Sequence, residues 1–256
     1  MNASTGIVAV VTGGSRGIGL ATARALMSGG ARVAVMATSD DTLRAAALEL
    51  EKLGRPDAVL PIRADVRDPK QVDQAIAAVV RRFGGLDVLV NNAGVGIFRP
   101  VTDMTDDEWH QVMETNLTGV FYCCRAALPH LRARGGGWII NISSLSSTGP
   151  FAGGAAYCAS KAGLNAFTEA LMQEVRQDGV RVACVLPGSV RTGFSGRKPG
   201  VDDPSKASGS TRASSSDAWK LAPEDVAQTV AALVGYPARS LPSRIEIRPS
   251  QPPAKG

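Results

Sequence analysis

The feature that most constrains the fold of this chain is a regular alternation of short apolar runs with longer amphipathic segments. The apolar runs have the length of β-strands, and the segments between them carry apolar residues at helical spacing. Such alternation is typical of parallel strands joined by helical crossovers, which cover both faces of the sheet. The expected strands are Ile7–Val11, Arg32–Ala37, Ala58–Ala64, Leu86–Val90, Trp138–Ile142, Val180–Leu186 and Arg244–Ile247.

Capping signals set the ends of the helices between these strands. Asp40 is expected to be the N-cap of a helix that ends at Gly54, and Pro69 opens a helix that Gly84 stops. With right-handed crossovers, the sequence predicts an α/β fold, a doubly wound, Rossmann-like parallel sheet of about seven strands. The expected helices are Ile18–Ser28, Asp40–Leu53, Pro69–Phe83, Asp106–Arg134 with a bend near Asn116, Ala155–Gln177 and Glu224–Val234.

Length and composition favour one dinucleotide-binding and catalytic domain that spans residues 1–256. Apolar residues make up 44% of the chain and charged residues 20%, which is typical of a globular protein. Residues 195–216 are rich in Ser, Gly, Lys and Pro, so we expect a mobile substrate loop there. Residues 249–256 are expected to form a frayed tail.

Composition also bears on location and partners. No apolar run approaches the ~20 residues of a membrane helix, and the N-terminus lacks a signal-peptide pattern. The four cysteines have no metal-ligand spacing and are interpreted as small buried side chains in a reducing cytoplasm. The net charge of +5 is scattered without a run of Lys and Arg, which argues against nucleic-acid binding. We therefore expect a cytoplasmic protein with neither a metal nor a membrane contact, whose positive field attracts an anionic cofactor.

A glycine-rich turn, Thr12–Gly19, joins the first expected strand to the first expected helix. Glycines let a backbone approach a pyrophosphate, and a helix N-terminus offers free N–H groups and the positive end of its dipole. The glycines at 13, 17 and 19 depart from the common G-x-G-x-x-G spacing, so the alternative is a turn that only packs strand against helix. Its position after the first strand favours the cofactor site.

The end of the second expected strand favours NADP(H) over NAD(H). An acidic residue at this point would bind a ribose 2′-hydroxyl and repel a 2′-phosphate, whereas this chain has Thr38 and Ser39. Both hydroxyls can donate hydrogen bonds to phosphate, and Arg16 in the glycine turn adds a charged planar fork. Asp40 and Asp41 lie just beyond, where they can instead cap the next helix.

Tyr157 and Lys161 are four residues apart, which places both side chains on one face of a helix. A neighbouring ammonium group favours the phenolate and is expected to lower the tyrosine pKa by roughly 1–3 units, making Tyr157 a general acid or base. Ser144 follows the strand Trp138–Ile142, where its hydroxyl can bind a substrate oxygen. A solvated helix face and an ordinary serine turn are the alternatives for these residues.

Together these residues resemble the short-chain dehydrogenase/reductase family in its single-domain branch. The resemblance runs from about Ile7 to Thr192, with a weaker fit over Pro223–Ile247. The motifs that carry it are Thr12–Gly19, Asn91–Gly94, Asn116, Ser144 with Tyr157 and Lys161, and Pro187-Gly188. The glycine turn and residues 37–39 look most like bacterial NADPH-dependent 3-oxoacyl-[acyl-carrier-protein] reductases.

The resemblance implies a role for each matching residue. Ser144 would hold the substrate carbonyl oxygen, Tyr157 would deliver its proton, and Lys161 would bind the nicotinamide ribose and tune Tyr157. Asn116 would hold a water of the proton relay, which completes a catalytic set of Asn116, Ser144, Tyr157 and Lys161. The residues implied to bind the cofactor are Gly13, Gly14, Ser15, Arg16, Gly17, Ile18, Gly19, Thr38, Ser39, Asp65, Val66, Asn92, Tyr157, Lys161, Pro187, Gly188, Val190 and Thr192.

The resemblance also implies a homotetramer or homodimer packed through the helices Asp106–Arg134 and Ala155–Gln177. The sequence departs from the family pattern at Phe194–Ser216, which is polar where many relatives have an apolar lid, and at Arg244–Pro249. These departures put the acyl-carrier-protein substrate in question. The leading hypothesis is an NADP(H)-dependent oxidoreductase that acts on a carbonyl or secondary alcohol. Its rival is an NADP(H)-binding redox sensor without turnover.

Overall fold

The computed structural model describes residues 6–53, 56–194 and 218–251, and these residues form the expected doubly wound parallel sheet. The order of its strands is β3-β2-β1-β4-β5-β6-β7, and every neighbouring pair is parallel. The strands lie where the apolar runs predict them, with ends shifted by a residue or two. They are β1 Val8–Thr12, β2 Arg32–Ala37, β3 Val59–Arg63, β4 Val88–Asn91, β5 Gly137–Ile142, β6 Val180–Pro187 and β7 Arg244–Ile247.

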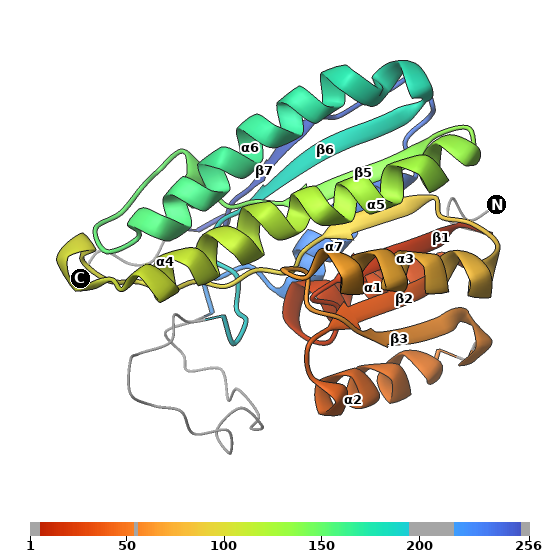
Figure 1. Ribbon diagram of the computed structural model, residues 1–256, viewed down its shortest axis with the longest axis horizontal. Helices are drawn as coiled ribbons and strands as arrows, with labels where there is room; N and C mark the ends of the chain where they lie inside the picture. Colours follow the sequence, from red (N-terminus) through yellow and green to blue (C-terminus); the bar gives the residue numbers. More distant parts are fainter. Residues whose placement is uncertain (1–5, 54–55, 195–217, 252–256) are drawn as a thin grey trace.

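Helices cover both faces of this sheet (Figure 1). On the near face, α3, α5 and α6 bury one apolar core, and on the far face α1, α2 and α7 bury a second. The described helices are α1 Gly17–Ser28, α2 Asp40–Glu51, α3 Pro69–Phe83, α4 Asp106–Met113, α5 Gly119–Ala133, α6 Ala155–Val175 and α7 Pro223–Val234. Among the described residues, none of the helices has both the length and the apolar character of a membrane span.

Two expectations about helix ends need correction. The N-cap of α2 is Ser39 and not Asp40, because the Ser39 hydroxyl accepts the backbone N–H of Thr42 at 3.4 Å. Asp40 is instead the first helical residue and pairs with Arg63 across to β3. The long helix expected over 106–134 is divided into α4 and α5 by a π-helical segment, Glu114–Thr118. The bend expected near Asn116 is therefore a local widening of the helix.

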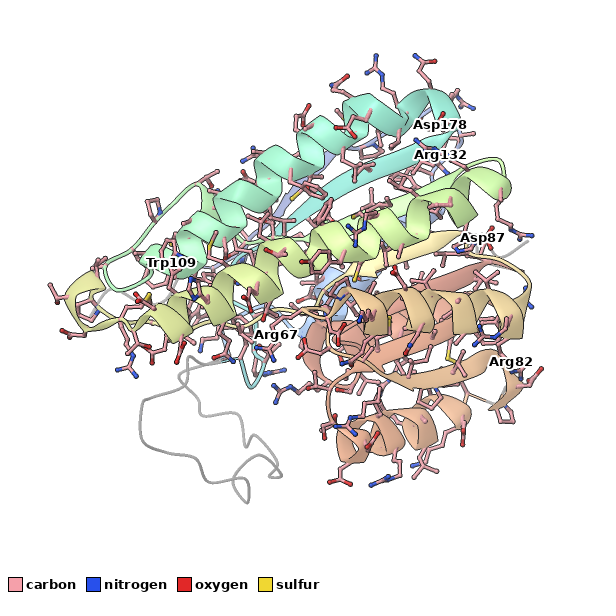
Figure 2. All side chains as sticks on the ribbon, viewed as in Figure 1. Arg67, Arg82, Asp87, Trp109, Arg132 and Asp178 are labelled. Atoms are coloured by element: carbon pink, nitrogen blue, oxygen red, sulfur yellow. The ribbon has the colours of Figure 1, made fainter. Side chains whose placement is uncertain are left out.

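The amino-terminal edge of the sheet is fastened by exposed ion pairs. Arg134 at the end of α5 pairs with Asp87 before β4, and Arg132 pairs with Asp178 before β6. Figure 2 shows Asp87, Arg132 and Asp178 together at this end of the molecule, away from Arg67 and Trp109. The opposite edge carries the loops in which the predicted site residues lie.

The remaining expectations about composition have mixed outcomes. The four cysteines are buried free thiols, as expected, and burial raises the pKa of Cys123 to about 12. A thiol with that pKa stays protonated and inert at neutral pH. The substrate loop expected over 195–216 lies outside the described residues, as does most of the tail expected over 249–256.

Candidate active site

The predicted site residues meet at the carboxyl edge of the sheet, where the strand order reverses. Strand β1 pairs with β2 on one side and with β4 on the other, so the turns after β1 and β4 lie next to each other. In doubly wound sheets this reversal opens the crevice in which ligands bind. The glycine turn and the segment Asn91–Gly94 form its walls.

The glycine turn packs so closely on the segment after β4 that side chains would not fit. Gly13 has a φ of 62°, and a Cβ there would lie 2.9 Å from Ala93 Cα. A Cβ on Gly19 would lie 2.3 Å from Gly13 O. The Asn92 side chain donates to Thr12 O and Gly13 O, at 3.0 and 3.1 Å, and the Thr12 hydroxyl accepts the backbone N–H of Asn92 at 3.0 Å. Asn92 thus braces the turn, and Thr12 is a brace that sequence reasoning missed.

The rim of this turn has the character of an anion site. Arg16 is the N-cap of α1, is exposed, and makes no side-chain capping bond. No acidic residue lies in the first turn of α1. Ser15 accepts a hydrogen bond from the hydroxyl of Thr42 at 3.1 Å, and Thr38 and Ser39 are exposed at the end of β2. This set of hydroxyls, one cation and free helix N–H groups suits phosphate.

Asp65 and Val66 lie just beyond the end of β3, at the same edge. The Asp65 carboxylate is held by Arg67, whose Nη2 donates at 2.6 Å, and this hydrogen bond holds the pKa of Asp65 below its ordinary value. The Asp65 backbone N–H donates to Gln71 at 3.0 Å. Val66 packs against Gly119, where a Cβ would lie 2.8 Å from Val66 Cγ2. Sequence reasoning missed Arg67, whose position two residues after Asp65 was the available signal.

Tyr157 and Lys161 share one face of α6, as their spacing predicts. Lys161 Nζ lies 5.9 Å from the centre of the Tyr157 ring and donates to Ile142 O, the last residue of β5, at 2.8 Å. The expected lowering of the tyrosine pKa is wrong for the protein alone. Burial raises the pKa of Tyr157, and a hydrogen bond with Ser144 only partly opposes that rise. With a pKa raised by burial above its ordinary value of 10.0, the Tyr157 phenol stays protonated at neutral pH.

Lys161 itself lies in an unusual place for a lysine. It is almost fully buried, and burial lowers its pKa to about 8, while the nearby Cys184 acts in the opposite direction. With a pKa near 8, the Lys161 amine changes its charge close to physiological pH. A nearby anionic group would therefore readily raise this pKa and favour the charged form. A Cβ on Gly94 would lie 3.7 Å from Lys161 Nζ, which places the lysine at the crevice wall.

Ser144 is both a turn serine and a neighbour of Tyr157. Its hydroxyl accepts the backbone N–H of Ser146 at 3.1 Å and so caps the short 3-10 helix Leu145–Ser147. The preceding Ser143 donates to Lys161 O at 3.3 Å, which ties the loop after β5 to α6. The turn predicted as the alternative for Ser144 is confirmed, and it places the hydroxyl beside Tyr157. That Ser144 binds a substrate oxygen stays a prediction.

Asn116 lies in the π-helical segment and is fully buried. Its side chain accepts from Val95 N at 2.8 Å and donates to Val95 O at 2.9 Å and to Ser160 Oγ at 3.0 Å. Ser160 in turn donates to Tyr157 O at 2.8 Å. The Asn116 side chain thus links the loop after β4 to the catalytic helix, and its predicted hold on a water stays a prediction.

The segment after β6 closes the crevice from a third side. Pro187 ends β6, and a Cβ on Gly188 would lie 3.2 Å from Leu145 Cδ1, in the loop that carries Ser144. Val190 forms an isolated bridge to Leu221, and Thr192 Cγ2 would lie 3.4 Å from a Cβ on Gly17 in the glycine turn. The segment after β6 therefore lies close to both the segment after β1 and the segment after β5. Ile18 lies in the first turn of α1, between Gly17 and Gly19.

Aromatic rings surround Tyr157, and sequence reasoning missed them. The Phe98 ring centre lies 5.6 Å from that of Tyr157, nearly perpendicular to it, and the Phe194 ring lies at 5.8 Å. Phe151 lies 5.3 Å from Phe98. Isolated phenylalanines in three separate loops carry no spacing signal, so only the folded chain brings them together.

Comparisons with known proteins agree with this geometry. The family model described as short chain dehydrogenase matches residues 7–199. An uncharacterized oxidoreductase of Staphylococcus aureus strain MW2 is 31% identical over 97% of this chain and 100% of its own length. Among solved structures, a metagenomic short-chain oxidoreductase in complex with NADP is 36% identical, with a TM-score of 0.80, over 98% of this chain and 100% of that one. A variant of actinorhodin polyketide ketoreductase with NADPH is 34% identical, with a TM-score of 0.83, over 95% of this chain and 96% of that one.

The fold and the site thus define an oxidoreductase of the doubly wound, dinucleotide-binding class. The matched model covers most of the chain, and the relatives match over nearly its whole length. The chain belongs to the short-chain dehydrogenase/reductase family.

Proposed function

We propose that this protein interconverts a carbonyl compound and the corresponding secondary alcohol with NADP(H), and that Tyr157 exchanges the proton. The observation that carries the proposal is the buried, protonated Tyr157, which lies beside both Ser144 and Lys161 at the carboxyl ends of the strands. The relatives that were solved with NADP and NADPH support the choice of cofactor. The absence of a carboxylate at Thr38 and Ser39 supports it independently.

The glycine turn would hold the pyrophosphate, because four of its residues, Gly13, Gly14, Gly17 and Gly19, carry no side chain and the turn leads into the N-terminus of α1. Arg16, Thr38 and Ser39 would hold the 2′-phosphate, and Asp65 with Val66 would line the adenine end. The bound cofactor supplies or accepts the hydride at the reacting carbon. These roles rest on the positions of the residues at one edge of the sheet.

In reduction, Ser144 orients the substrate oxygen by donating a hydrogen bond to it. Tyr157 then gives its phenolic proton to that oxygen as the hydride reaches the carbon, so one alcohol forms and one tyrosinate remains. Lys161 stabilises the tyrosinate by its charge, then gives it a proton and takes a replacement proton from solvent, so Tyr157 and Lys161 both return to their starting state. The substrate panel includes 3-oxoacyl thioesters, because the glycine turn and residues 37–39 resemble those of 3-oxoacyl-[acyl-carrier-protein] reductases.

The experiment follows oxidation of NADPH and of NADH with a panel of ketones, aldehydes and 3-oxoacyl thioesters. We expect carbonyl-dependent turnover with NADPH, and at least about tenfold lower kcat/KM with NADH, because NADH lacks the 2′-phosphate that Arg16, Thr38 and Ser39 would hold. Binding of NADPH without turnover of any carbonyl would overturn the proposal in favour of a redox sensor.

A further inference from the structure

The strongest unassigned feature of the site is an aromatic wall, defined as the rings of Phe98, Phe151 and Phe194. Phe98 comes from the loop after β4, Phe151 from the loop after β5, and Phe194 from the segment after β6. These rings are 37%, 45% and 40% exposed, which is high for phenylalanine side chains that lie so near a buried catalytic residue. Exposed apolar surface beside reacting groups indicates that a ligand covers it.

The wall is built on loops that are fastened in place. Ile97, directly before Phe98, is buried against Val112 and Ala156 in a small separate core. The backbone N–H of Arg99 donates to Gly153 O at 2.7 Å, which joins the loop of Phe98 to the loop of Phe151. The loops that carry Phe98 and Phe151 are therefore joined to each other before any ligand arrives.

Two glycines lie beneath the rings and allow this placement. A Cβ on Gly96 would lie 2.9 Å from Phe98 Cζ and 3.0 Å from Phe194 Cε1. A Cβ on Gly154 would lie 2.7 Å from Phe151 Cε2. The rings thus rest directly on backbone, and their outer edges and faces are what a substrate would meet.

The charge of the wall also limits the substrate. Arg99 is the sole cation of residues 95–104 and 145–154, and it donates to Glu108 at 2.7 Å in a half-buried pair. The loops that carry Phe98 and Phe151 hence offer apolar rings and no free cation for a phosphorylated or carboxylated substrate. Edge-to-face contacts favour another aromatic ring as the occupant.

We propose that the aromatic wall receives an aryl group attached to the reacting carbonyl carbon, so that the substrates are aryl ketones and the matching aryl alcohols. The inference rests on the proposed function and names its substrate class. Phe98 and Phe194 contact the ring of Tyr157, so an aryl group seated against them places its carbonyl next to the phenol and Ser144.

Equilibrium binding tests the wall apart from catalysis. Calorimetry would compare 1-phenylethanone with 2-butanone on the protein loaded with NADP⁺, which supports no reduction. We expect the aryl ketone to bind at least about tenfold more tightly, and Phe98→Leu and Phe151→Leu each to remove most of that preference. Tyr236→Leu is the matched control, because Tyr236 is an exposed aromatic residue beside Arg181 at the opposite edge of the sheet.

Steady-state reduction of the same two ketones by NADPH gives the second reading. We expect kcat/KM to favour the aryl ketone in the wild type, and the phenylalanine variants to lose this preference. Equal binding of the two ketones by the wild type would overturn the inference even if both are reduced. Preferential binding of the aryl ketone without any turnover would support the wall and contradict the proposed function instead.

Discussion

The glycine turn after β1 and the catalytic face of α6 meet in one crevice, yet they hold their functional groups by different means. The turn works through backbone, because Gly13 and Gly19 leave no room for a Cβ against Ala93 and Gly13 O. The face of α6 works through buried side chains, with Asn116 bonded to Ser160 and Lys161 bonded to Ile142 O. A cofactor bound at the turn would thus meet mainly backbone, whereas the proposed proton donor, Tyr157, depends on the buried side chains around it.

The largest effect is expected from a substitution in the glycine turn, where backbone atoms hold the site. In Gly19→Ala, the added Cβ must displace Gly13 O and the Asn92 amide, which it would approach to 2.3 and 2.5 Å. We expect the dissociation constant for NADPH to rise about 100-fold or more, and the free energy of unfolding to fall by about 3 kcal/mol. Gly149→Ala is the control, since its Cβ would meet only Leu145 O at 3.6 Å. Unchanged binding by Gly19→Ala, measured by fluorescence titration, would contradict this account of the turn.

The corresponding substitution beside α6, where buried side chains hold the site, is Asn116→Ala. It leaves the Val95 N–H without its acceptor and removes two donated hydrogen bonds in a fully buried place. We expect the free energy of unfolding to drop by about 2–4 kcal/mol in urea titrations. A loss below about 0.5 kcal/mol would show that the π-helical segment does not depend on this side chain.

These two sides also differ in how far the sequence predicts them. The glycine turn and the spacing of Tyr157 and Lys161 are local patterns, so the fold, the turn and the shared helix face of these two residues could be predicted from sequence, while their catalytic role stays a prediction. The pKa of Tyr157 could not, because burial depends on Phe98 and Phe194 from distant loops. The bracing role of Thr12 was missed for the same reason, since its partner Asn92 comes close only in the folded chain. Arg67 was missed although its partner Asp65 is only two residues away.

A smaller effect is expected in how the free energy of unfolding depends on pH, because Lys161 is buried. Lys161 has a pKa of about 8 in the folded protein against 10.5 ordinarily, so the unfolded chain binds more protons between these values. The wild-type free energy of unfolding should therefore rise with pH across this window, by about 2–3 kcal/mol, relative to Lys161→Met. The raised pKa of Tyr157 acts in both proteins and cancels in the comparison. Curves of the free energy of unfolding against pH that stay parallel for the wild type and Lys161→Met from pH 7.5 to 10.5 would contradict the lowered pKa of Lys161.

The smallest effect concerns the exposed rim of the turn. Ser39→Asp keeps an N-cap acceptor for α2, so folding should be unaffected. Its carboxylate would repel a 2′-phosphate, and we expect the preference for NADPH over NADH in kcat/KM to fall by about tenfold. An unchanged ratio would place the 2′-phosphate elsewhere.

The central claim, that Tyr157 gives the proton to a carbonyl substrate, is tested most directly by Tyr157→Phe under single-turnover conditions with NADPH. The account predicts NADPH binding close to that of the wild type and a rate of carbonyl reduction lower by a factor of about 1,000 or more, since the ring remains and only the proton donor is removed. Reduction at the wild-type rate by Tyr157→Phe would contradict it.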